Sequence, residues 1–239
     1  MINSLLQLPL GIQLRDDATF DNYLPGPNRT ALSVLCQTNS SGNLPVEQFI
    51  YLYGVPGSGC THLLQAACYE AHHLKQQSVY LPVNKLIHYS PKLLESMENL
   101  DLICIDNINA LANNHQWEEA IFHLFNRVRD TGNRLIIGGN SAPRQLNLNL
   151  EDLTSRLSWG LVVQILPLND NEKCAALRLR AQLRGFEISD DVARYILHYS
   201  PRNMHKLFHI LAVLDEASLS AKRKLSIPFV REVMHCYHQ

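Results

Sequence analysis

An apolar run that leads into a glycine-rich loop and then into a helical pattern constrains this fold most. The run near residues 48–54 is followed by "GVPGSGCT", Gly54–Thr61, and then by "HLLQAA". The loop fits the pattern G-x-x-x-x-G-[K]-[ST] at every fixed position except one, where Cys60 replaces the lysine. Such a loop points backbone N–H groups at phosphate oxygens, and the following helix adds its dipole. The sequence therefore predicts a strand, loop and helix that bind nucleotide phosphates.

The missing lysine predicts weak triphosphate binding. One charge-assisted contact is worth roughly 1.5 to 3 kcal/mol, or about ten- to a hundredfold in affinity, and the γ-phosphate depends on it most. Thr61 offers a hydroxyl to Mg²⁺, and Asp106, at the end of "LDLICID", is placed like a metal-binding carboxylate at the end of a second strand. Asn107 follows where a catalytic carboxylate would orient water, and an amide is no base. We therefore expect diphosphate binding with little intrinsic ATP hydrolysis.

The rest of the chain alternates strand-like runs with helical patterns and then becomes helical throughout. Parallel sheets covered by helices on both faces produce this alternation, so we predict an α/β fold with a parallel five-stranded sheet and a small C-terminal helical lid domain. Helices are expected at 61–75 and 117–129. The other four strands are expected near 78–83, 100–106, 133–139 and 160–166.

Four helical stretches follow residue 171. The first ends at Gly185, Ser189 is placed to cap the second, and Pro201 is placed in the first turn of the third. The expected domains are an arm at 1–20, the nucleotide-binding α/β domain at 21–167, and the helical lid at 168–239.

Composition excludes several classes of protein. A formal net charge of −1 argues against strong direct binding of nucleic acid. Six cysteines form no CxxC pair, so a metal site of their own is not expected. No apolar run is long enough to span a bilayer and no leader is evident, which makes the cytoplasm the expected location.

Five segments resemble the AAA+ ATPase module of the DnaA family of bacterial replication initiators. They are "ATFDNYLPGPNRTAL", "GSGCTHLLQAA", "LICIDNINAL", "RLIIGGNSAPRQL" and "LTSRLSWGLVVQI". In combination with "LRLRAQLRGFEI" and "RKLSIPFVREV", they resemble the members of this family that inactivate the initiator. Since the chain stops at Gln239, a DNA-binding domain of the kind that ends an initiator is not expected.

The resemblance implies a set of nucleotide-binding residues. ADP, with or without Mg²⁺, is the implied cofactor. Asn140 would face the γ-phosphate, and His205 occupies a lid position where the family carries an arginine, so phosphate affinity is expected to be lower than in relatives. Arg202 and Lys206 are its nearby cations. The implied nucleotide contacts are Tyr23, Leu24, Pro25, Gly54, Pro56, Gly57, Ser58, Gly59, Cys60, Thr61, His62, Asp106, Asn140 and His205.

The resemblance also implies two partners. Arg156 would act in trans as an arginine finger on ATP bound to the DnaA initiator. Leu6, Gln7, Leu8, Pro9 and Leu10 would bind the DNA polymerase sliding clamp on DNA, which would place the chain at the nucleoid. Leu5 stands where the clamp motif begins with glutamine, so a shorter motif starting at Gln7 remains open, as does an arm folded onto its own domain. A homodimer or oligomer is also possible.

Two other functions remain open. An independent AAA+ ATPase such as a helicase loader would turn over ATP without partners. An interaction module with a decayed pocket would bind no ADP.

Overall fold

The computed structural model describes residues 18–37 and 47–237. The chain divides into two compact units. The first holds Asn28–Val55 and Gly59–Leu166, and the second holds Asp21–Pro27, Pro56–Ser58 and the helical region from Pro167.

The first unit contains the predicted parallel five-stranded sheet. Its order is β2-β3-β4-β1-β5, and every neighbouring pair is parallel. The predicted α/β fold with a helical lid is confirmed. The strands are β1 (Phe49–Tyr53), β2 (Ser78–Pro82), β3 (Leu102–Asp106), β4 (Arg134–Gly139) and β5 (Leu161–Gln164).

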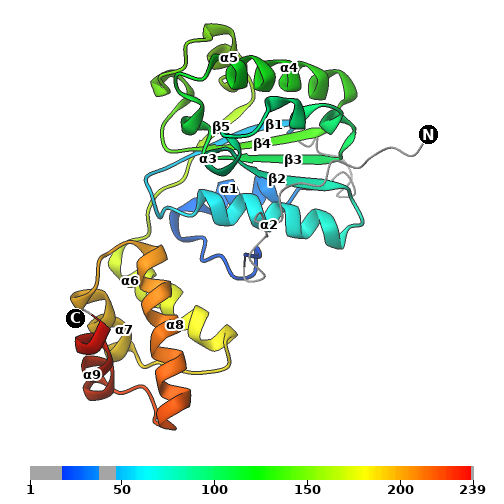
Figure 1. The fold of residues 1–239 in the computed structure, drawn as a ribbon. Helices are drawn as coiled ribbons and strands as arrows, with labels where there is room; N and C mark the ends of the chain where they lie inside the picture. The colour runs from blue at the N-terminus through cyan, green and yellow to red at the C-terminus, as the bar shows by residue number, and fades with distance from the viewer. Residues whose placement is uncertain (1–17, 38–46, 238–239) are drawn as a thin grey trace. The chain divides into compact units, whose positions relative to one another are not determined.

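Helices cover both faces of this sheet. Figure 1 shows α4 (His115–Thr131) and α5 (Glu151–Leu157) on one face, and α1 (Arg29–Leu35) and α2 (Cys60–His73) on the other. Because both faces are covered, the inner strands are apolar without alternation, and all five residues of β3 are buried. The edge strand β5 instead alternates half-buried with exposed residues. The predicted helices at 61–75 and 117–129 correspond to α2 and α4.

Short elements complete the first unit and its connections. The sequence did not predict α1, α3 (Val83–Leu86) or α5, because four to seven residues are too few for a clear helical period. The 3-10 turns are η1 (Gly26–Asn28), η2 (Pro91–Leu94), η3 (Met97–Asn99), η4 (Ile108–Leu111) and η5 (Pro143–Gln145).

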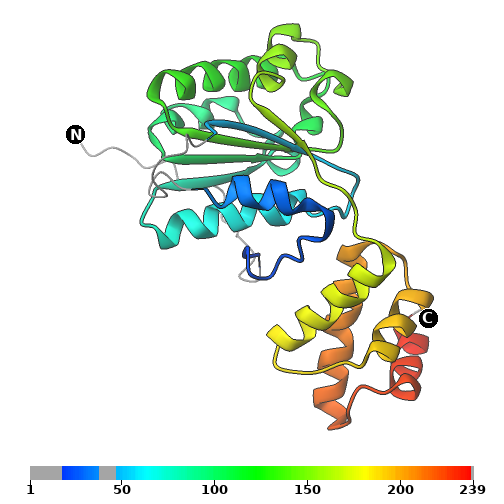
Figure 2. The same ribbon diagram turned by 180° about the vertical axis from the view of Figure 1, so that it is seen from behind.

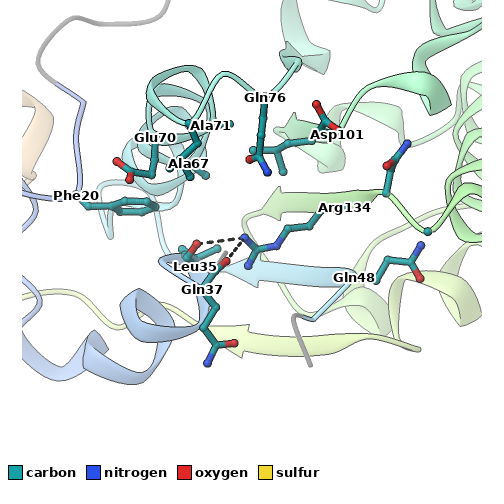
Figure 3. Close-up of a pocket in the computed structure, with 14 residues that line it drawn as sticks. Phe20, Leu35, Gln37, Gln48, Ala67, Glu70, Ala71, Gln76, Asp101 and Arg134 are labelled. Atoms are coloured by element: carbon teal, nitrogen blue, oxygen red, sulfur yellow. Dashed lines mark hydrogen bonds between the residues drawn. The ribbon is translucent and has the colours of Figure 1, made fainter. Parts of the chain in front are cut away.

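Arg134, the first residue of β4, fixes the end of α1 at the amino edge of the sheet. Its guanidinium donates to the carbonyls of Leu35 and Gln37 beside a cavity of about 90 Å³ (Figure 3). It also donates to the carbonyls of Val34 and Glu47. Burial lowers the pKa of Arg134 below its ordinary value. We read this cation as structural, because backbone carbonyls of α1 and the following chain occupy its donors.

The second unit is built from α6 (Asp170–Leu183), α7 (Asp190–Tyr199), α8 (Met204–Ala221) and α9 (Ile227–Tyr237), coloured yellow to red in Figure 2. Their apolar faces form one core, in which Leu177, Leu207 and Leu211 are fully buried. Gly185 follows α6 with φ of 87°, and the Ser189 side chain accepts from the Val192 N–H, as predicted. No helix in the described part of the chain is long and apolar enough to cross a membrane.

The prediction that Pro201 lies in the first turn of the third lid helix is wrong. Helix α8 begins at Met204, and Asn203 is its N-cap. The Asn203 side chain accepts a hydrogen bond of 2.9 Å from the His205 N–H, which satisfies an open donor of the first turn. Because Asn203 is the cap, the helix begins three residues after Pro201.

Candidate functional site

The glycine-rich loop joins β1 to α2 in the geometry that an anion needs. Gly57 and Gly59 have φ of 88° and 110°, a region that only glycine adopts readily. Gly59 is the N-cap of α2, and no described side chain caps this helix end. A glycine-rich turn that leads directly into the N-terminus of a helix has the geometry that binds a phosphate group.

Asp106, the last residue of β3, accepts three hydrogen bonds beside this loop. Thr61 Oγ1 donates to Asp106 Oδ2 at 2.8 Å, and the Tyr80 hydroxyl donates to the same oxygen at 2.6 Å. The Asn107 N–H donates to Oδ1 at 2.8 Å. Burial, followed by the charge of Asp106, raises the pKa of Tyr80, so this hydroxyl keeps its proton and remains a donor. Asp106 is 3% exposed, and these donors stabilise its charge.

Thr61 and Asp106 fit the magnesium ion that the sequence predicts with a nucleotide. Hydroxyl and carboxylate oxygens are the ligands that Mg²⁺ prefers, together with phosphate oxygens and water. The structure brings these two side chains into contact from α2 and β3. Magnesium at this pair would neutralise phosphate charge; its presence stays a prediction.

Cys60 is the first residue of α2 and is half-buried. Its thiol carries no positive charge with which to replace the lysine of the loop pattern. Tyr51 lies near it: burial raises the pKa of Tyr51, and Cys60 contributes to the rise. The loop therefore retains its backbone geometry while its first helical residue supplies no cation.

Asn140 lies directly after β4, at the same sheet edge as the start of the loop. Gly54 N–H donates to the Gly139 carbonyl at 3.3 Å, which places the two chain segments side by side. The Tyr51 hydroxyl donates to the Ser141 carbonyl at 2.9 Å and fixes the turn after Asn140. A Cβ at Gly139 would collide with this hydroxyl, so the close approach requires glycine. Asn140, which the resemblance places toward the γ-phosphate, thus lies at the carboxyl edge of the sheet.

The remaining predicted nucleotide residues lie in several places. His62 Nε2 lies 2.8 Å from the Thr19 carbonyl in the first unit. Tyr23, Leu24 and Pro25 belong to the second unit, as do Pro56, Gly57, Ser58 and His205. Their contact with a nucleotide stays a prediction.

Of the two cations near His205 in sequence, Arg202 and Lys206, the structure pairs Arg202 with a carboxylate. Arg202 Nη1 is paired with Asp170 Oδ2 at 3.2 Å. Both residues are exposed, so this pair contributes little stability. The pair nevertheless engages Arg202, the arginine closest to His205 in sequence, with a carboxylate.

Arg156 lies at the opposite sheet edge from the loop. It is in α5, and the β5 strand that follows pairs with β1 so that Leu161 lies opposite Ile50. Arg156 lines a small cavity with Phe49 and Ile50, the first two residues of β1. The loop starts after Tyr53, and a five-residue strand places its first and last Cα atoms about 13 Å apart. The predicted finger is therefore not assembled with Thr61 and Asp106 of the same chain.

Glu118 on α4 holds the start of α5. Its Oε2 accepts from the Asn149 and Leu150 N–H groups at 2.9 and 2.8 Å. Glu118 is fully buried, and its other oxygen, Oε1, has no hydrogen-bond partner within the described residues. This carboxylate fixes the chain that leads into the helix carrying Arg156.

The predicted clamp residues 6–10 lie outside the described residues.

The sequence analysis missed four residues that the structure brings into the site or its support. Tyr51, Tyr80 and Glu118 are buried polar residues whose partners are distant in sequence. Trp159 contacts Arg156, and in the sequence only its spacing of three residues from the arginine indicates that contact.

Two family models match the chain. Residues 14–164 match the family described as the bacterial DnaA ATPase domain, and residues 170–234 match the family described as Hda, lid domain. The first match alone covers more than half of the chain. The two matches meet near Leu166, where the structure divides into its two units.

Solved structures show the same fold. Domain III of the Thermotoga maritima replication initiation protein DnaA superposes with a TM-score of 0.78 at 20% identity, over 94% of this chain and 98% of that one. DnaA from Aquifex aeolicus with bound AMPPCP gives 0.72 at 23% identity, over 84% and 66%. The Thermotoga maritima RuvB Holliday junction branch migration motor gives 0.62 at 17%, over 80% and 62%. At these identities the likeness concerns the fold alone.

Proposed function

The chain belongs to the family of the bacterial DnaA ATPase domain, and we propose that it is a negative regulator of replication initiation. In this proposal the chain binds ADP, associates with the sliding clamp, and stimulates hydrolysis of ATP held by the initiator DnaA. The match of residues 170–234 to the Hda lid family supports a DnaA-related regulator rather than an initiator.

The position of Arg156 carries the proposal. Arg156 lines a cavity together with the first residues of β1, whereas the phosphate loop follows the last residue of that strand. An arginine side chain does not bridge this separation, so Arg156 is suited to a phosphate bound by another protein. A guanidinium that meets the charge developing on a transferred phosphoryl group accelerates hydrolysis by about 10³ to 10⁵.

Arg156 is also available for such a contact. Within the described residues, no carboxylate lies within ion-pair distance of it. Arg127, Arg178, Arg184, Arg194, Arg202 and Arg223, by contrast, pair with carboxylates. An arginine without a carboxylate partner keeps its full charge for a phosphate.

The chain's own nucleotide site suits ADP as a stable ligand. The glycine loop and the N-terminus of α2 would bind the two phosphates through backbone N–H groups. Thr61 and Asp106 would hold Mg²⁺, which neutralises phosphate charge. Cys60 leaves a γ-phosphate without its lysine, and Asn107 offers no base. We infer that bound ADP stabilises the fold and that this chain has little ATPase activity of its own.

A reconstitution tests the proposal. ATP hydrolysis is measured with ATP-bound DnaA, clamp loaded on DNA, ADP and this chain, with each component omitted in turn. The proposal expects stimulated hydrolysis only in the full mixture, and loss of this stimulation with Arg156→Ala. Arg231→Ala, an exposed lid arginine, is the matched control and should retain stimulation. Full stimulation by Arg156→Ala would refute the finger.

The same preparation separates the alternatives. An independent ATPase such as a helicase loader would turn over ATP without DnaA. A decayed pocket would show no binding of labelled ADP in a direct titration. The proposal expects ADP binding and negligible turnover by the chain alone.

A further inference from the structure

An exposed tryptophan, Trp159, lies beside the proposed finger. The guanidinium carbon of Arg156 lies 5.5 Å from the centroid of the Trp159 ring, within the range of a cation–π contact. Trp159 follows α5 in a turn in which its N–H donates to the Arg156 carbonyl at 3.1 Å. This turn keeps the two side chains on one face, three residues apart.

The tryptophan ring is itself held by the core. Phe49 and Phe125 stack at 4.1 Å, and the Trp159 ring lies 6.0 Å from the first and 6.3 Å from the second. Both phenylalanines are buried, whereas Trp159 is 58% exposed. The ring therefore has a fixed inner contact and an outer part open to solvent.

The backbone next to Trp159 is also fixed. A Cβ on Gly160 would lie 2.3 Å from the Phe49 carbonyl oxygen, so the chain passes against β1 at a distance that only glycine permits. Glu118 fixes the other end of α5. The helix that carries Arg156 is thus anchored before and after the arginine.

We propose that Trp159 is the positioning residue for Arg156, and that its ring holds the guanidinium in place for the phosphate of the partner's ATP. This inference rests on the proposed function. A carboxylate in this place would neutralise the arginine and compete with phosphate. An aromatic face orients the guanidinium and leaves its charge and its N–H donors for the incoming oxygens.

The proposal predicts an effect on rate rather than on affinity. Without the ring, the guanidinium samples more rotamers, and fewer of them meet the transition state. Trp159→Leu should lower the maximal stimulated rate of ATP hydrolysis about two- to fivefold, the range of an exposed cation–π contact. The concentration for half-maximal stimulation should change little. Trp159→Phe keeps an aromatic face and should restore most of the rate.

The experiment measures stimulated hydrolysis by the full chain with ATP-bound DnaA, ADP and clamp loaded on DNA. It compares wild type, Trp159→Leu, Trp159→Met, Trp159→Phe and Arg156→Ala over a range of chain concentrations. Val162→Ala, in the edge strand β5 that follows Trp159, is the control for loss of an exposed apolar contact. Thermal unfolding checks each variant, and Trp159→Met replaces Trp159→Leu if the latter does not fold.

The outcomes separate the inference from the proposed function. Loss of activity in Arg156→Ala together with a wild-type rate in Trp159→Leu would overturn the positioning role and leave the finger intact. A raised half-maximal concentration at an unchanged maximal rate would also overturn it, since Trp159 would then be a docking contact. Equal losses in Trp159→Phe and Trp159→Leu would exclude the aromatic contact. Full activity in Arg156→Ala would overturn both proposals.

Discussion

Thr61 Oγ1 donates a hydrogen bond of 2.8 Å to Asp106 Oδ2, and this bond joins the first turn of α2 to the end of β3. The two residues that the sequence assigned to magnesium therefore meet. The same first turn begins with Cys60, so the site has the two predicted oxygen ligands but no lysine.

Cys60→Lys should tighten ATP binding about ten- to a hundredfold, because a charge-assisted hydrogen bond to the phosphates is restored. Isothermal titration of ATP and ADP into the purified chain measures the change, with the larger gain expected for ATP. Cys60→Ser removes the thiol without adding charge and is the control. An unchanged ATP affinity in the lysine variant would contradict the importance of this charge.

Glu118→Gln should lower the free energy of unfolding by about 1 to 3 kcal/mol, because the N–H groups of Asn149 and Leu150 lose a charged acceptor. Urea unfolding measures the effect. Glu119→Gln, a change at the neighbouring and exposed glutamate, should have an effect within about 0.5 kcal/mol. Equal effects of the two changes would mean that Glu118 does not hold the start of α5.

Alkaline pH should destabilise the first unit through Tyr51 and Tyr80. Burial raises the pKa of both above the ordinary value of 10.0, so the folded chain holds these protons more tightly than the unfolded chain. This stability is fully present below the unfolded pKa and is lost as pH rises above it, by about 1.4 kcal/mol per pH unit for each tyrosine.

The measurement is urea unfolding at about pH 9 and about pH 11. Tyr80→Phe and Tyr51→Phe should each flatten the decline, although both cost stability at neutral pH through a lost hydrogen bond. Tyr89→Phe removes an exposed hydroxyl and serves as the surface control. A decline as steep in Tyr80→Phe as in wild type would exclude this tyrosine as its source.

Replacement of Leu8 and Leu10 by alanine should detach the chain from the sliding clamp, because the predicted motif inserts these apolar side chains into a groove. A pull-down with purified clamp measures binding, and Asn3→Ala is the control within the same segment. Leu5→Ala and Gln7→Ala then decide the register, since only the residue that begins the motif should matter. Retained binding in the double variant would exclude the segment.

The sequence predicted the sheet and the long helices because their signals are local. Apolar runs bounded by polar residues marked all five strands, and the loop pattern placed Thr61 at the start of α2. The start of α8 was misplaced because Pro201 and Asn203 both suit a helix start, and the choice depends on which side chain caps the first turn.

The contacts between distant residues were not predictable from local pattern. Tyr80 lies opposite Cys104 in the register of β2 and β3, which places its side chain on the face that Asp106 shares two residues later. A sequence that reveals two strands does not reveal their register. Glu118 gave no signal either, since a glutamate on a helix is usually exposed.

The two ends of the short strand β1 lead to different surfaces of the first unit. Its carboxyl end leads into the loop that we propose binds a diphosphate, and Phe49 at its amino end belongs to the aromatic pair that contacts Trp159, which lies beside Arg156. A complex that uses the arginine end of one chain and the phosphate end of its neighbour is head-to-tail and joins two unlike surfaces. If a further subunit binds through the same head-to-tail contact, the assembly grows in one direction and does not close as a symmetric dimer.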